Sequence, residues 1–354
     1  MFEESVKYYT ERILFQNSLQ IISFIPKEIN LKAKLLFQVL INLLVCSFLI
    51  LFSFRETGLD YKAYMMEFYD PINNSVSSEF GYKILIKIIN PFVDFWFLLL
   101  ICNIIFYLSH RKIINNLYNP LQIFVFFIYF INLSVFLILG SPRRLVANSI
   151  VVYIIYNEFS KGANNKNYFL AIIASLFHTS AVVIVPIIYF LRHRISQWFS
   201  ISIIFKLILG GVISFLMLHF TGILNLIFIK IDYYLIHSLK EQEYLSEVPS
   251  VMLGFVKRFV SLFLVWLAIR RWDNNQFVLK LGTVEVILYT VLGYFNPVLA
   301  VVATYLSICY LLPFTMPEFR KCNNSTKTIL MLSVWIYFVP TIIGLIRMFG
   351  NMYV

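Results

Sequence analysis

Two adjacent arginines after a glycine–serine–proline turn are the most chemically suggestive residues of the sequence. Arg143 and Arg144 directly follow Pro142, and proline is well tolerated at the first position of a helix. Two cations at a helix N-terminus oppose the positive end of the helix dipole, so a bound anion would offset both terms. Because the planar guanidinium fork fits phosphate oxygens, the pair predicts a site for an anion such as phosphate. The alternative is that both side chains reach outer lipid headgroups.

A histidine within a long apolar run is the second candidate. His178 lies in the segment NYFLAIIASLFHTSAVVIVPIIYFL, residues 167–191. A lone histidine in such a run is often a satisfied packing residue. An ionisable residue at a bend inside the membrane is instead a functional hypothesis by default. The sequence leaves both interpretations open.

Two acidic residues could handle protons. Asp60 lies a few residues after an apolar run, and a carboxylate there could orient or deprotonate a sugar hydroxyl. Glu79 is a second acid of this kind, and we count Arg55, Glu79 and Tyr61 as candidate substrate-binding residues. The alternative is that both acids are ordinary solvated loop residues. The sequence has no glycine-rich nucleotide loop and no metal-ligand spacing, so we expect neither a metal nor a cofactor.

Composition places these residues in a membrane protein. Of the 354 residues, 60% are apolar and 13% are charged, against about 25% charged residues in soluble domains. The net charge of +11 is dispersed between apolar runs, as in the loops that orient membrane helices. The four cysteines are isolated and suggest no disulfide framework. These features argue against a soluble enzyme and against a nucleic-acid binder.

Apolar runs of about 20 residues, long enough to cross a bilayer, recur along the chain. We expect one all-α transmembrane domain over residues 1–354, with about 10–12 membrane segments. Two external loops, at about 55–88 and 221–250, should carry short helices, and Tyr233 and Tyr234 in the second could bind sugar faces. The first segment, 13–25, is short and should lie at the interface. The expected spans are 35–54, 89–109, 120–140, 144–159, 198–220, 251–270, 277–295, 297–315 and 328–348.

The distribution of lysine and arginine predicts an orientation and one unusual segment. Pairs such as Arg111–Lys112, Lys161–Lys166 and Arg270–Arg271 all fall inside only if residues 167–191 enter the membrane and return to the same side. We therefore expect a broken helix pair with its bend at His178. Each arm of about 12 residues would rise about 18 Å, short of the roughly 30 Å core. The alternative is a single spanning helix.

More cations fall on the outer side than the positive-inside rule explains. They include Arg55, Arg143, Arg144, Lys257 and Arg258. An excess of outward arginine suits a substrate with an anionic leaving group, and apolar surroundings suit a lipid tail.

Residues 141–190 resemble the EpsG-like branch of the Wzy-type polysaccharide polymerases. The likeness lies in Pro142-Arg143-Arg144 before a small-residue helix, and in the later run Phe177-His178-Thr179-Ser180-Ala181. Residues 55–64 are similar to the first external loop of that family, and Glu79-Phe80-Gly81-Tyr82 to its next acidic turn.

Two features depart from the family pattern. The usual N-terminal apolar stretch is interrupted here by charges, which affects the helix count. The late "RLS.YF" pattern appears as Tyr305-Leu306-Ser307-Ile308-Cys309-Tyr310, without the arginine. An anion contact at this point would have to come from elsewhere, for example from Arg258 or Arg347.

The resemblance implies a GT-C-like membrane glycosyltransferase of polysaccharide or lipopolysaccharide (O-antigen or capsule) biosynthesis. It would act on the outer face of the bacterial inner membrane. It would transfer glycan from one undecaprenyl-pyrophosphate carrier to another carrier-linked repeat unit, with a chain-length regulator protein as a partner. In this scheme Arg143, Arg144 and Arg258 hold the donor pyrophosphate, Asp60 acts on the acceptor hydroxyl, and His178 positions a substrate.

Two other functions would also want a cationic outer cavity. The first is a flippase or exporter of lipid-linked oligosaccharide. Transporters often contain paired repeats with broken helices, whereas this sequence indicates one broken pair and no second half that resembles the first. A membrane O-acyltransferase or glycan ligase, which would also use histidine and arginine, is the second.

Overall fold

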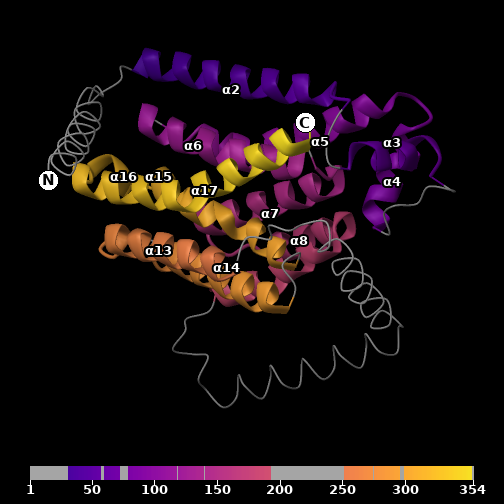
Figure 1. Cartoon of the computed structure of the whole chain (residues 1–354). Helices are drawn as coiled ribbons and strands as arrows, with labels where there is room; N and C mark the ends of the chain where they lie inside the picture. Colours follow the sequence, from indigo (N-terminus) through magenta and orange to yellow (C-terminus); the bar gives the residue numbers. More distant parts are fainter. Residues whose placement is uncertain are drawn as a thin grey trace, which may run out of the picture.

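The computed structural model describes residues 31–56, 60–71, 79–117, 119–138, 140–192, 251–273, 275–295 and 299–352. These residues form helices and turns, and no β-strand occurs among them. Figure 1 shows the longer helices stacked side by side in a bundle, with the short helices α3 and α4 at one end of it. The all-α class predicted from the sequence is therefore confirmed.

Five helices in the described ranges are long and apolar enough to cross a membrane. Much of their apolar surface is exposed; Leu51 of α2, for example, is 71% exposed. A bilayer surrounds such surface with lipid at no hydrophobic cost, so the chain is a polytopic membrane protein. The five are α2 (Leu31–Ser53), α5 (Phe95–Ile114), α13 (Val251–Ile269), α14 (Asn275–Phe295) and α17 (Asn324–Met352).

Helix α7 (Pro142–Lys161) is the central element of the bundle. The side chain of Ser141 caps it by accepting a hydrogen bond from the Arg144 backbone N–H at 3.5 Å. The middle of α7 is almost completely buried, and it packs against α5, α8 (Lys166–Phe177) and the 3-10 helix η3 (Leu299–Tyr310). Because protein surrounds α7, its first turn lies within the helix bundle, with Arg143 and Arg144 partly exposed.

Two expected helices are broken into different helix types. The span expected at 120–140 is α6 (Pro120–Leu133) followed by a π-helix, η1 (Ser134–Ile138). The span expected at 297–315 is η3, then α15 (Leu312–Thr315), with α16 (Pro317–Lys321) following. A 3-10 run of 12 residues is much longer than the usual three or four, and periodicity in an apolar stretch could not reveal it.

The segment at 167–191 is a hairpin of two helices, as expected. Helix α8 ends at Phe177, His178 is extended (φ −151°, ψ 116°), and a 3-10 turn η2 (Thr179–Val183) leads into α9 (Ile184–Arg192). The Arg192 guanidinium donates to the Asn165 side chain at 3.2 Å and to the Asn164 carbonyl at 2.6 Å. In one straight helix these residues would lie about 40 Å apart, so the single-helix alternative is wrong.

The loop expected at 55–88 contains the short helices α3 (Tyr61–Tyr69) and α4 (Phe80–Ile89). The expected span at 89–109 begins later, at Phe95, because Asn90-Pro91 end α4 and start a turn. The loop expected at 221–250, the span at 198–220 and the short segment at 13–25 lie outside the described residues.

Polar contacts mark the two ends of α7. At its C-terminal end, Glu158 pairs with Arg192, and Asn157 accepts from Lys112 Nζ at 3.4 Å. Gly162, with φ 79°, ends the helix there and turns the chain toward the hairpin. At the N-terminal end lie Arg143 and the hairpin tip. The two ends therefore carry different charge networks.

Candidate active site

Glu79 is the centre of a charged cluster at the N-terminal end of α7. It lies at the N-cap of α4, and its side chain is only 2% exposed. One carboxylate oxygen pairs with the Arg143 guanidinium, and the other lies 3.4 Å from Nδ1 of His178. The structure therefore brings together three residues from the list of candidates, contributed by α4, α7 and the tip of the hairpin.

Arg143 is held from two sides. Its Nε donates to the Tyr64 hydroxyl at 2.7 Å, and that hydroxyl lies 2.7 Å from Ser141 Oγ. Since Tyr64 accepts from Arg143, it can donate its own proton to Ser141. Burial raises the pKa of the Tyr64 phenol, while the charge of Arg143 lowers it. The arginine is thus fixed in orientation, with its side chain 15% exposed.

Glu79 partly offsets the unfavourable placement of two cations at the positive end of one helix dipole. It supplies a carboxylate to Arg143 from within the protein. The charge of Arg144 also acts on His178 and on Tyr305 of η3. With a neutral imidazole, Glu79, Arg143 and Arg144 together carry a net charge of +1. This positive charge favours the binding of a further anion.

The hairpin tip that carries His178 is fixed by two contacts. Ser180 Oγ lies 3.2 Å from the Tyr305 hydroxyl of η3. A Cβ at Gly81 would lie 3.1 Å from the Leu176 carbonyl group, so glycine lets α4 approach the last turn of α8 closely. The His178 side chain remains 17% exposed, and the imidazole therefore lies at the edge of the cluster.

Arg55 supports the junction before α7. Its guanidinium donates to the carbonyl groups of Ile138 and Gly140, the latter at 3.4 Å, where η1 ends. Burial lowers the pKa of Arg55 to about 10, although it stays charged at neutral pH. In this structure Arg55 thus holds the chain one and three residues ahead of the Ser141 cap.

Asp60 and Tyr61 lie at the border of this region. Asp60 is the exposed N-cap residue of α3, and its carboxylate acts electrostatically on Arg55 and Tyr64. Tyr61 packs its ring against Phe95 at a centroid distance of 5.4 Å. Asp60 is thus linked to the cluster through the charge of Arg55 and through Tyr64.

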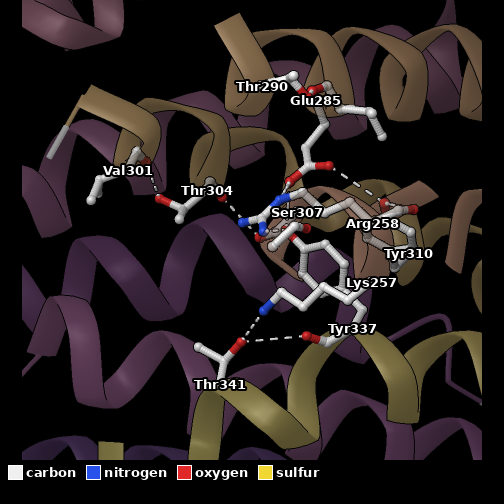
Figure 2. A network of polar contacts seen from close by, with 12 residues as sticks. Lys257, Arg258, Glu285, Thr290, Val301, Thr304, Ser307, Tyr310, Tyr337 and Thr341 are labelled. Carbon is white, nitrogen blue, oxygen red and sulfur yellow. Dashed lines mark hydrogen bonds and ion pairs between the residues drawn. The ribbon is translucent and has the colours of Figure 1, made fainter. Parts of the chain in front are cut away.

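Arg258 lies in a different cluster, between α13, α14, η3 and α17. Its Nε donates to Glu285 at 2.8 Å (Figure 2). The structure therefore does not place Arg258 with Arg143 and Arg144. Tyr233 and Tyr234 lie outside the described residues. Within the described ranges, no group of three potential metal ligands occurs.

Four further members of the cluster were not predicted from the sequence: Tyr64, Ser141, Ser180 and Tyr305. Ser141 carried a usable signal, because a serine before proline and a helix is typical of an N-cap. Tyr305 stands at the arginine position of the family's "RLS.YF" pattern and here contacts the hairpin tip. Tyr64 carried no comparable signal, since its partner Arg143 is 79 residues away.

The fold and the cluster together define a class: an all-α polytopic membrane protein with a buried glutamate–histidine–arginine site at one end of its bundle. The chain belongs to the EpsG family, whose model matches residues 36–353. This membership suggests a glycan polymerase-like membrane protein that uses lipid-linked sugars. No curated protein and no solved structure matches the chain significantly.

Proposed function

We propose that the protein is a polysaccharide polymerase. It transfers glycan from an undecaprenyl-diphosphate carrier to the repeat unit on a second carrier, at the outer face of the bacterial inner membrane. The observation that carries this proposal is the cluster in which Glu79 contacts both Arg143 and His178. It combines a proton acceptor with cations for a diphosphate leaving group, beside a lipid-exposed helix bundle.

The orientation follows from charge. Lys112 and Arg192 lie at the C-terminal end of α7, and Lys280 of α14 lies 5.9 Å from the Phe190 ring near the same end. The positive-inside rule assigns this end to the cytoplasm. The cluster around Glu79 then faces outward, on the side where surface polysaccharides are assembled.

The reaction is a substitution at the anomeric carbon of the donor glycan. The acceptor hydroxyl oxygen forms the new bond to that carbon, and the bond to the carrier diphosphate breaks. His178 takes the hydroxyl proton, with Glu79 orienting the imidazole and stabilising its charged form. Arg143 and Arg144 stabilise the diphosphate as it leaves. Asp60, at the border of the site, orients the acceptor sugar.

The test is the length of surface glycan in cells. Arg143→Ala and His178→Ala should each lower polymerisation by about 10²–10³-fold, the usual cost of removing one such contact. Gels should then show a single capped repeat in place of a ladder. Arg270→Ala, an exposed arginine at the other end of the bundle, is the matched control and should leave the ladder intact.

Normal ladders from both site variants, at normal expression, would contradict the site assignment. Loss of all surface glycan, including the single repeat, would point to export of the lipid-linked unit. An added acyl group on an otherwise normal product would point to an acyltransferase. Mass spectrometry of the product separates these outcomes.

A further inference from the structure

A second buried charge cluster lies among the membrane helices and takes no part in the mechanism above. Its centre is Glu285 of α14, which is fully buried. The carboxylate accepts from Arg258 Nε at 2.8 Å, from the Tyr337 hydroxyl at 2.7 Å and from the Tyr310 hydroxyl at 3.4 Å (Figure 2). Glu285 therefore balances the charge of Arg258 and has both of its oxygens engaged.

A backbone carbonyl and an aromatic ring make further contacts with the Arg258 guanidinium. It donates to the Gly254 carbonyl at 3.2 Å, and its guanidinium lies 3.5 Å from the centroid of the Tyr289 ring. A Cβ at Gly254 would lie only 1.9 Å from the Tyr289 hydroxyl, so glycine makes room for this ring. With 7% of its side chain exposed, Arg258 is a structural cation.

Lys257, the neighbouring residue, has a different environment. Its ammonium group donates to Thr341 Oγ1 at 2.5 Å and lies 5.5 Å from the Tyr337 ring (Figure 2). The charges that act on it in the described part of the chain are Arg258 and Glu285, which cancel one another. The cluster therefore carries a surplus of one positive charge, located on Lys257.

A surplus cation within a membrane span is costly unless an anion compensates it. Lys257 is only two turns from the start of α13, at the end of the helix that the charge pattern assigns to the outer side. We propose that Lys257, with Thr341, forms a second anion site that binds the diphosphate of a polyprenyl carrier. The Thr341 hydroxyl accepts from Lys257 and donates to the Tyr337 carbonyl at 3.4 Å. Turned toward a phosphate oxygen instead, it would donate beside the charge of the ammonium group.

Helix η3 connects this site to the candidate active site. Tyr305 contacts Ser180 at the hairpin tip, and Tyr310 contacts Glu285. Five residues of a 3-10 helix rise about 10 Å, so the two charge clusters lie along one rigid element. A reaction between two carrier-linked substrates needs two diphosphate sites. The acceptor's diphosphate, which stays intact, would bind Lys257; this role rests on the proposed function, whereas the anion site itself does not.

The experiment counts diphosphate sites without requiring catalysis. Farnesyl diphosphate, a sugar-free probe, is titrated onto the full-length protein in nanodiscs of phosphatidylcholine, and bound copies are counted by native mass spectrometry. The wild type should bind two copies and Lys257→Met one. Lys257→Arg should bind two, which shows that the charge matters. Lys280→Met, at the other end of the bundle, is the matched control and should also bind two.

Two results would overturn the site. One is two bound copies of the probe on Lys257→Met whose thermal unfolding curve shows that it is folded. The other is Lys257→Arg that binds no more copies than Lys257→Met. The source of the anion is tested by repeating the titration in phosphatidylglycerol nanodiscs. Farnesyl diphosphate should still fill the second site there. If excess probe fails to displace the lipid, Lys257 serves headgroups and the carrier proposal fails.

The acceptor role has a separate kinetic test. In a polymerisation assay, Lys257→Met should raise the KM for the acceptor at least about tenfold, equivalent to one lost charged contact, with the donor KM unchanged. An unchanged acceptor KM would overturn the role. Two bound probes in a protein without polymerase activity would sink the proposed function and leave the anion site standing.

Discussion

At the scale of single residues, Glu79 has two tasks that call for different measurements. It neutralises Arg143 in a buried pair, and it faces the imidazole of His178. Breaking a buried pair by removing one partner is strongly destabilising, because it leaves the other charge uncompensated. A loss of activity on replacing Glu79 would therefore mix a folding effect with a catalytic one.

A double substitution separates the two tasks. Glu79→Gln alone should lower stability by about 3 kcal/mol, because Arg143 is left without its carboxylate. Glu79→Gln combined with Arg143→Met removes both charges and should recover most of that loss, while polymerisation stays absent. Thermal unfolding in detergent and the glycan ladder measure the two effects. Glu56→Gln, an exposed acid nearby, is the control and should change neither.

Recovery of activity together with stability in the double variant would show that the pair is only structural. Equal destabilisation of the single and double variants would show that the charges do not act as a pair.

At the scale of elements, the hairpin α8–η2–α9 is the device that brings a histidine to α7. Its base is closed by Arg192, which binds Glu158, Asn164 and Asn165. Its tip is held by the contact of Ser180 with Tyr305. Because both ends are fixed, the position of His178 is set by the lengths of the two arms.

Labelling of single cysteines tests the hairpin in the membrane. In a chain with its natural cysteines replaced, Asn165→Cys and Ile195→Cys should both react from the cytoplasmic side only. Lys62→Cys, an exposed residue of α3, should react from the outer side only. Reaction of positions 165 and 195 from opposite sides would contradict the hairpin and the orientation of the site.

At the scale of the whole molecule, the features that the sequence predicted are those that depend on neighbouring residues, such as helix starts and charge patterns. The helix start at Pro142 follows from Ser141 and proline, and the hairpin follows from basic residues at both its ends. The pairing of Glu79 with Arg143 spans 64 residues, and that of Arg258 with Glu285 spans 27. Partners so distant depend on how apolar helices pack, and helices that are hydrophobic on all faces give no periodic signal for that packing.

The helix type of η3 also could not be predicted from the sequence. The run Leu299–Tyr310 is as apolar as part of a membrane span, and its composition would be the same in an α-helix or in a 3-10 helix. The choice between them decides whether Tyr305 and Tyr310 reach two different clusters. Only the packed structure shows that they do.

The most direct test of the account is polymerisation by the purified protein. Carrier-linked repeat units are added to the protein in liposomes without an ion gradient, and product length and free undecaprenyl diphosphate are measured. We expect longer carrier-linked glycan, with one diphosphate carrier released for each bond formed, and about 10²–10³-fold less of both with His178→Ala. Wild-type protein that leaves the repeat units at their original length, or only moves them across the bilayer, would contradict it.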